Sequence, residues 1–466
     1  MIEQFIENRI LQALPFTPNE GQRALLSHLS QFITRNPQSK VHHCFILRGY
    51  AGTGKTSIMA AMVRVMDQLK QSVVLLAPTG RAAKVLSHYA HQPAYTIHKC
   101  IYRQQQLGVE RFSLTDNLRK NTLFIVDEAS MISGQKDSSS FGSGMLLDDL
   151  VRFVYSGDGC RLLLLGDDAQ LPPVGSSLSP ALDDDYMAGY GLQIHSFTLT
   201  QVARQALDSG ILNNATQLRE QIAADNDYDV HYTYTPDFQA LSPADFIEEL
   251  ERAYRETGIE ETIILTRTNR RTNLYNQAIR THILWKEDAI SASDRLMVSK
   301  NNYYWTRQYE NLPFLANGDM LEIVRLRNER EMYGFHFADA SLRALDYDWE
   351  IDAILWLDTL TTDSPEANYE LQKVLYTRIA EDYPELQHNK KKLTEAIYQS
   401  PYFNALQVRF AYAVTCHKAQ GGQWKQVFID TGNVPDDQRN TDYLRWLYTA
   451  ITRATEKVRV VEYVNV

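Results

Sequence analysis

The sequence predicts an α/β protein with two parallel-sheet domains and a smaller inserted module. Short apolar runs that end in polar or glycine-containing turns have the composition of buried parallel strands, and they occur at 44–47, 73–76, 123–126 and 162–165. Helix-like segments such as 57–69 and 82–89 lie between them. A second set of strand-like runs follows at 262–266, 410–414, 426–429 and 458–463. The stretch 295–408 has a different character and interrupts this second set.

The composition is that of an ordinary globular protein. The 466 residues, 44% hydrophobic and 22% charged, suggest two to four domains. A net charge of −10 argues against a protein that coats nucleic acid, but local positive charge and backbone donors could still grip a few phosphates. The four cysteines are scattered, which predicts neither a zinc site nor a disulfide framework. With no secretory signal and no apolar run long enough for a membrane helix, we expect a cytoplasmic protein.

Residues 49–56 (GYAGTGKT) match the pattern G-x-x-x-x-G-K-[ST] between an apolar strand and a helix. Glycines let the backbone wrap around phosphates, and successive N–H groups and the helix N-terminus then face the negative charge. Lys55 is expected to reach the β- and γ-phosphates, and Thr56 to bind magnesium. The segment therefore predicts ATP and Mg²⁺ as cofactors, with the remaining phosphate-binding positions at Gly49, Gly52, Thr53 and Gly54.

Two further segments end buried strands. In 126–130 (VDEAS), Asp127 is expected to hold Mg²⁺, and Glu128 to orient or deprotonate the attacking water. Alone, such an acidic pair would usually be solvated surface, but its place at a strand end after the phosphate loop favours the catalytic interpretation. In 166–173 (GDDAQLPP), Gln170 could donate to the γ-phosphate and accept from water as a sensor of the nucleotide state. A proline-stiffened turn is the alternative for this segment.

Taken together, these three segments resemble the superfamily 1 helicases, and the form GDxxQLPPV of the third is similar to the RecD-like branch. The resemblance covers about residues 16 to 463. It implies two RecA-like P-loop motor domains, at 1–200 and at 201–294 with 409–466, and a β-barrel of the Src-homology type in the insert 295–408. It also implies a β-hairpin pin at 99–121, although a simple connecting loop remains open there. The helix-like part 364–400 exceeds a minimal barrel.

Other motifs of this family follow in order. Gln22 resembles the adenine-recognising Q-motif, and Gly421 ends the motif V segment 415–421 (TCHKAQG). Arg204 in 199–205 (LTQVARQ) and Arg453 in 448–454 (YTAITRA) would be arginine fingers. A surface salt bridge is the alternative for each. If both arginines reach the nucleotide, ATP must lie in a cleft between two domains, whose closure and release would turn hydrolysis into motion.

The resemblance also implies a single strand of DNA held across both motor domains by sequence-independent phosphate contacts. The candidate DNA-binding residues are Thr79, Arg81, His98, Asn269, Thr415 and His417. It further implies movement from 5′ to 3′, forked duplex DNA as a partner, a possible protein loading partner, a monomeric state and a role in DNA repair or recombination.

We therefore expect an ATP-dependent DNA helicase or translocase, with two alternatives left open. An RNA-directed motor of the same superfamily is one, because nothing in the sequence identifies a group that reads a sugar 2′-hydroxyl. A nucleotide-switched, nucleic-acid-binding scaffold without unwinding is the other. The full set of candidate catalytic residues argues against that scaffold, which would be free to lose some of Lys55, Glu128, Gln170, Arg204 and Arg453.

Overall fold

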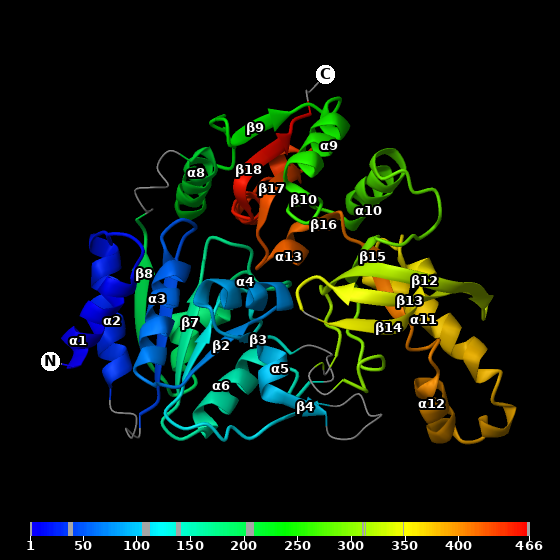
Figure 1. Ribbon diagram of the computed structural model, residues 1–466, viewed down its shortest axis with the longest axis horizontal. Helices are drawn as coiled ribbons and strands as arrows, with labels where there is room; N and C mark the ends of the chain where they lie inside the picture. Colours follow the sequence, from blue (N-terminus) through cyan, green and yellow to red (C-terminus); the bar gives the residue numbers. More distant parts are fainter. Residues whose placement is uncertain are drawn as a thin grey trace.

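The computed structural model describes residues 2–35, 41–104, 112–136, 141–201, 209–309, 312, 314–347 and 349–463. Two parallel sheets and a closed barrel lie side by side, with the C-terminus at the second sheet and the N-terminus beside the first (Figure 1). The expected α/β fold with an inserted barrel is thereby confirmed. No helix among the described residues is long and apolar enough to cross a membrane.

The first sheet has six parallel strands in the order β3-β2-β6-β7-β1-β8. The strands are β1 (His43–Gly49), β2 (Val73–Ala77), β3 (Ala94–Thr96), β6 (Leu123–Val126), β7 (Arg161–Gly166) and β8 (Gln193–Leu199). The helices around it are α1 (Ile2–Ala13), α2 (Glu20–Thr34), α3 (Lys55–Gln68), α4 (Gly80–Ala90), α5 (Ile97–Ile101), α6 (Leu146–Ser156) and α7 (Asp184–Ala188). Strands β6 and β7 are buried along their whole length, as strands covered on both faces must be.

Alternate residues of the central strands serve two cores. Phe45 and Leu47 of β1 pack in a cluster with the apolar faces of α1, α2 and α3, whereas Cys44 and Ile46 join a second cluster with α5 and α6. This alternation is the period of two that a strand imposes on its side chains. The two clusters fix the sheet between its helical layers, so that the carboxyl ends of β1, β6 and β7 meet at one edge.

The second sheet has five strands in the order β16-β10-β17-β18-β9, all parallel. The strands are β9 (Phe238–Leu241), β10 (Thr262–Thr266), β16 (Ala413–Thr415), β17 (Trp424–Asp430) and β18 (Ala454–Val461). The helices are α8 (Gly210–Ala224), α9 (Phe246–Thr257), α10 (Asn269–Ala278), α13 (Cys416–Ala419) and α14 (Thr441–Ile451). Helix α14 is almost entirely buried and follows an Asn440 cap, whose side chain accepts from the Tyr443 N–H.

The barrel closes in the order β11-β12-β13-β14-β15. Its strands are β11 (Arg295–Val298), β12 (Met320–Met332), β13 (Phe335–Ala344), β14 (Glu350–Trp356) and β15 (Leu406–Phe410). The expected helical extension is present as α11 (Pro365–Ala380) and α12 (Lys390–Gln399), which pack on the barrel through Leu375, Ile397 and Trp356. Figure 1 shows both helices beyond the barrel, on the side away from the first sheet.

The expected continuous strand at 410–414 is wrong. Phe410 ends β15 of the barrel, and Ala413 begins β16 of the second sheet. Between them, the buried Tyr412 donates its hydroxyl to Asp294 Oδ1 at 2.8 Å, and its backbone N–H donates to Asn276 Oδ1 at 3.0 Å. These bonds turn the chain from one sheet to the other, and an apolar run gives no sign of such a turn.

A small antiparallel pair, β4 (Tyr102–Gln104) and β5 (Phe112–Leu114), follows α5 and forms the expected β-hairpin. Residues 105–111, which join the two strands, lie outside the described residues. The Phe112 ring lies 4.7 Å from that of Phe141 and 4.8 Å from that of Tyr303. The base of the hairpin therefore packs against the segment that follows β11 of the barrel.

Candidate functional site

The phosphate loop joins β1 to α3. Gly54 caps α3 with φ +85°, a left-handed conformation that favours glycine, and an added Cβ would lie 2.8 Å from Gln22 Nε2. The Lys55 ammonium donates to the carbonyls of Gly49 and Tyr50, the latter at 3.0 Å. The loop is thus folded around the cation that would meet the phosphates. The buried Thr53 closes it with a bond from its hydroxyl to the Tyr50 carbonyl at 2.7 Å.

Gln22 supports this loop from behind. It forms a capping box with Asn19, in which each side chain accepts from the other's backbone N–H, at 2.8 and 3.0 Å. Its Nε2 donates to the Thr53 carbonyl at 2.9 Å, and the side chain is buried. Gln22 therefore fixes the backbone of the phosphate loop, a contact that the Q-motif comparison alone did not specify.

The acidic pair follows β6. Asp127 Oδ1 accepts from the Glu128 N–H at 2.9 Å, and Glu128 has φ +52°, a left-handed backbone conformation that is uncommon for residues other than glycine. Burial, and then the neighbouring charge of Glu128, raise the pKa of Asp127 to about 6. Such a carboxylate pair fits a divalent cation. No group of three or more His, Cys, Asp or Glu that could hold a metal occurs in the part of the chain that the structure describes.

Arg453 of the second domain lies beside this acidic pair. It follows α14, is 3% exposed, and its Nη1 lies 3.6 Å from Glu128 Oε1. Its Nε donates to the Thr449 carbonyl at 3.0 Å, which sets the direction of the guanidinium. A cleft of about 400 Å³ lies between the domains, and its lining includes Gly52, Gly54, Lys55, Thr56, Asp127, Glu128, Gln170, Gly421 and Arg453. The structure thus collects these predicted residues in one cavity, while Arg204 lies outside the described residues.

The turn 166–173 lies between the two domains. Gln170 is 7% exposed, and its Oε1 is buried without a partner among the described residues. The second domain holds the turn at Leu171, whose N–H donates to Thr449 Oγ1 at 2.9 Å and whose carbonyl accepts from Gln420 Nε2 at 2.8 Å. In the part of the chain that the structure describes, the Gln170 amide oxygen is buried without a partner, in a turn that the second domain holds in place. It is therefore suited to accept a hydrogen bond from a ligand or water in the cleft.

Tyr448 joins three parts of the site. Its buried hydroxyl accepts from the Ala51 N–H at 2.9 Å and donates to Asp167 Oδ2 at 2.7 Å. The phosphate loop, the turn after β7 and α14 therefore share one hydroxyl. No sequence pattern assigned a role to Tyr448, Thr449 or Gln420, although all three lie inside the motifs described above. A motif does not say which of its side chains reaches another domain.

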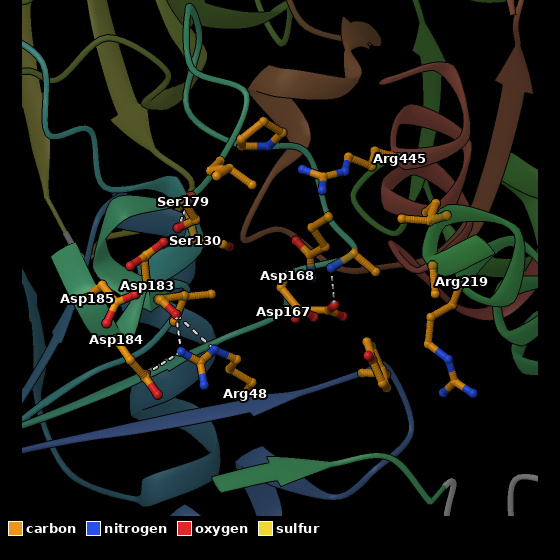
Figure 2. A pocket seen from close by; sticks show the side chains of 18 residues that line it. Arg48, Ser130, Asp167, Asp168, Ser179, Asp183, Asp184, Asp185, Arg219 and Arg445 are labelled. Carbon is orange, nitrogen blue, oxygen red and sulfur yellow. Dashed lines mark hydrogen bonds and ion pairs between the residues drawn. The ribbon is translucent and has the colours of Figure 1, made fainter. Parts of the chain in front are cut away.

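A second cavity, of about 490 Å³, adjoins the cleft and shares Tyr50, Asp167 and Gln170 with it. In Figure 2, Asp167 and Asp168 lie between Arg48 on one side and Arg219 and Arg445 on the other. Arg48 pairs with Asp184 within the first domain. From the second domain, the guanidinium of Arg219 lies 4.3 Å from the centre of the Tyr50 ring, and Arg445 donates to the Ser177 carbonyl at 3.2 Å. These contacts make the cavity part of the domain interface.

Two of the candidate DNA contacts lie at the start of α4. Thr79 caps this helix and accepts from the Ala82 N–H at 3.2 Å. Arg81 lies over the Trp424 ring at 4.1 Å and 3.5 Å from Asp346, which stands in the turn between β13 and β14. Arg81 therefore joins the first domain, the second domain and the barrel in this structure.

The other candidates are distributed as follows. Asn269 begins α10 and Thr415 is the cap residue of α13, so that both follow neighbouring strands at one sheet edge. His417 is exposed on α13. His98 instead packs among aromatic rings, 4.9 Å from that of Phe141. Motif V comes close to α4, since a Cβ on Gly421 would lie 2.7 Å from that of Ala82.

Comparison with known proteins gives two family matches and several relatives. An AAA domain model matches residues 19–231, and a UvrD-like helicase C-terminal domain model matches 410–461. Uncharacterized protein R530 of Acanthamoeba polyphaga mimivirus is 24% identical over 94% of this chain and 99% of its own length. The ATP-dependent RecD2 DNA helicase of Deinococcus radiodurans is 30% identical over 37% of this chain, and the ATP-dependent DNA helicase dda of Enterobacteria phage T4 is 27% identical over 43%.

The matched segments make up only 21% of RecD2 and 42% of dda. Among solved structures, Pif1 helicase from Bacteroides in complex with ADP-AlF3 and ssDNA aligns with a TM-score of 0.47 and 14% identity. That alignment covers 97% of this chain and 94% of the other.

Proposed function

We propose that this chain is a superfamily 1 helicase that couples ATP hydrolysis to movement on single-stranded DNA. The observation that carries the proposal is the reach of Arg453 across the domain boundary to within 3.6 Å of Glu128, beside the phosphate loop. An arginine supplied from a second domain makes the hydrolysis site complete only when the two domains come together.

Each cleft residue has a role in this proposal. Lys55 leaves the Gly49 and Tyr50 carbonyls to bind the β- and γ-phosphates. Thr56 and Asp127 would hold Mg²⁺, which would neutralise charge on the phosphate oxygens. Arg453 moves from Glu128 to the γ-phosphate. Glu128 is then released from its ion pair and can orient and deprotonate the attacking water. Gln170 provides the amide that senses the γ-phosphate, and Arg204 is the second finger.

Movement would follow from the shared contacts at the turn after β7. Tyr448 and Thr449 of α14 hold Asp167 and Leu171 of this turn. A change in the nucleotide therefore shifts α14 and the second sheet relative to the first. The DNA phosphates would then move from the contacts of one domain to those of the other. These contacts are Thr79 and Arg81 on the first domain, and Asn269, Thr415 and His417 on the second. Arg81 must leave Asp346 to do so.

The finer parts of the proposal are a 5′ to 3′ direction, action on forked duplexes, and a role in DNA repair or recombination. RecD2 and dda are both named DNA helicases, and this supports DNA as the polymer. The hairpin β4–β5 beside the barrel is the element we assign to strand separation.

Steady-state ATPase activity with and without single-stranded DNA tests the proposal, with Lys55→Ala as the control. Strong stimulation by DNA that is lost in the control is expected. If ATP turnover does not respond to DNA, or is stimulated more strongly by RNA, DNA is not the polymer on which this protein moves. Unwinding of forked duplexes with either a 5′ or a 3′ tail then tests the direction.

A further inference from the structure

We propose that the cavity between the barrel and its helical extension, which we call the barrel groove, is a second binding segment for the single strand and holds its bases. This inference rests on the proposed function, because it extends the same DNA path. The barrel groove encloses about 850 Å³. Its barrel side is lined by 299–303, Asn317, Asn404, Ala405 and Gln407, with part of the wall from Phe403 and Tyr398. Helix α11 forms the facing wall.

The chemistry of the lining is aromatic and amide-rich. Aromatic rings come from Tyr303, Tyr369, Tyr376, Tyr398 and Phe403, and side-chain amides from Asn301, Asn302, Asn317, Gln372, Asn404 and Gln407. Among the described residues that line the barrel groove, Lys300 and Lys373 are charged and none is acidic, although the chain has 57 Asp and Glu residues. Rings stack on bases, amides bond to base edges, and ammonium groups pair with phosphates.

Helix α11 presents a stripe toward this cavity. Tyr369, Gln372, Lys373 and Tyr376 are spaced at i, i+3, i+4 and i+7, which places them on one face. The opposite side of the helix, through Leu375, is buried against the barrel. Tyr369 remains 59% exposed, with the Lys373 ammonium 4.4 Å from the centre of its ring. The exposed Tyr369 ring can stack on a base. The Lys373 ammonium donates to the exposed Glu370 Oε1 at 2.8 Å, and a phosphate would replace that carboxylate as its partner.

The barrel groove also contains a buried hydroxyl group that could bond to a ligand. The Ser299 hydroxyl is buried and has no hydrogen-bond partner among the described residues. Its backbone N–H donates to the Gln407 carbonyl at 2.9 Å, which fixes its position on the barrel wall. A buried hydroxyl without a partner is unfavourable unless a ligand or water completes it.

The barrel groove continues the proposed DNA path. Asn317 lines it and accepts from Lys418 Nζ at 2.8 Å, and Lys418 stands next to His417 on α13. At the same region, Tyr303 packs on Phe112 of the β4–β5 hairpin. Figure 1 shows α13 between the second sheet and the barrel, with α11 beyond it. A strand that leaves the phosphate contacts of motif V therefore meets the barrel groove next.

The test uses the full chain carrying Tyr369→Ala together with Lys373→Glu, and thymidine oligonucleotides of increasing length. Short oligonucleotides that reach only the motor domains should bind the variant and the unaltered chain equally. Longer oligonucleotides should bind the unaltered chain more tightly than short ones do. The variant should bind these longer oligonucleotides roughly tenfold or more weakly than the unaltered chain, the effect of one lost stacked base. DNA-stimulated turnover at saturating DNA should not change.

The matched control is Val374→Ala with Lys390→Glu, two exposed positions on α11 and α12 that do not line the barrel groove. Equal length dependence in the variant and the unaltered chain would overturn the inference and leave the proposed function intact. The same holds if the variant loses binding of a proline-rich peptide instead, the other ligand suited to an aromatic groove. Failure of every oligonucleotide to bind the unaltered chain would overturn both.

Discussion

The nucleotide cleft and the barrel groove are built from opposite chemistries. The cleft sets Lys55 and Arg453 against Asp127 and Glu128, so its charges are paired across two domains. The barrel groove has aromatic rings, amides and lysines from one module, with no acidic residue in its lining. The first arrangement changes when the domains move, because its ion pair crosses the boundary. The second moves as a unit with the barrel.

This difference suggests a division of labour. A site whose charged groups come from two domains can bind tightly in one state and release in another. A groove within one module keeps its shape through the cycle, and its hold on a strand is independent of the nucleotide.

Arg453→Ala should lower kcat by about 10³–10⁵-fold, because it removes the cation that stabilises the transferring phosphoryl group. Binding of single-stranded DNA should persist. The measurements are steady-state ATPase activity and fluorescence anisotropy with a labelled oligonucleotide. Arg439→Ala serves as the control, since Arg439 pairs with Asp229 and Asp436 at the surface of the same domain. Loss of DNA binding with turnover unchanged would contradict the finger assignment and remove the cross-domain character of the cleft.

Glu128→Gln should lower turnover by about 10²–10⁴-fold while ATP still binds, because glutamine keeps the shape but cannot accept the proton. Filter binding of labelled ATP and single-turnover hydrolysis separate these two effects. Glu456→Gln, at an exposed position on β18, is the control. Near-normal turnover would exclude Glu128 as the base. The same variant should leave the length dependence of DNA binding unchanged, because the barrel groove and the cleft share no lining residue among those that the structure describes.

The local parts of the cleft could be predicted from the sequence. The phosphate loop, Asp127 and Glu128 each follow a buried strand at a fixed offset, so strand, turn and helix chemistry specify them. The barrel fold and its helical extension were also predicted, through resemblance and an inserted stretch of different character. Such features depend on neighbours in the chain, and a pattern of residues can report them.

Contacts between distant segments could not be predicted. Tyr448 bonds to Ala51 across nearly 400 residues, and Arg81 meets Trp424 and Asp346 from two other modules. These pairings depend on how surfaces fit together, which a linear pattern does not encode. The α11 stripe of the barrel groove also looks like an ordinary amphipathic helix until the facing barrel wall is known.

Asp319→Asn should raise the free energy of unfolding by about 2–4 kcal/mol at pH 8 and by little at pH 4. Burial raises the pKa of Asp319 to about 7, and its Oδ2 accepts from the Ala316 N–H at 2.7 Å. The folded state thus holds a proton that the unfolded chain releases near pH 4. The resulting stability is full below that pH and is lost as pH rises through 7. Asparagine keeps the acceptor without the charge.

Urea unfolding at the two pH values measures this effect, with the exposed Asp352→Asn as the control. Equal stabilisation at both pH values would show that Asp319 is not protonated in the folded chain. Asp319 lies close to the barrel groove, because it follows the turn that carries Asn317 into it. Below pH 7, a protonated Asp319 keeps negative charge away from a site proposed to hold phosphates.

Tyr448→Phe should have the smallest effect, roughly tenfold on DNA-stimulated kcat, the loss expected for one hydrogen bond to a charged group. The substitution removes the hydroxyl shared by Ala51 and Asp167 and keeps the ring in place. The KM for ATP and the turnover without DNA should change little, because Lys55 and the rest of the phosphate loop remain. Tyr443→Phe on the same helix is the matched control. If basal and stimulated turnover fall together, Tyr448 is only a packing residue. If only the stimulation of turnover by DNA falls, the hydroxyl transmits domain movement to the nucleotide. The barrel groove is formed by a single module and does not require such a coupling.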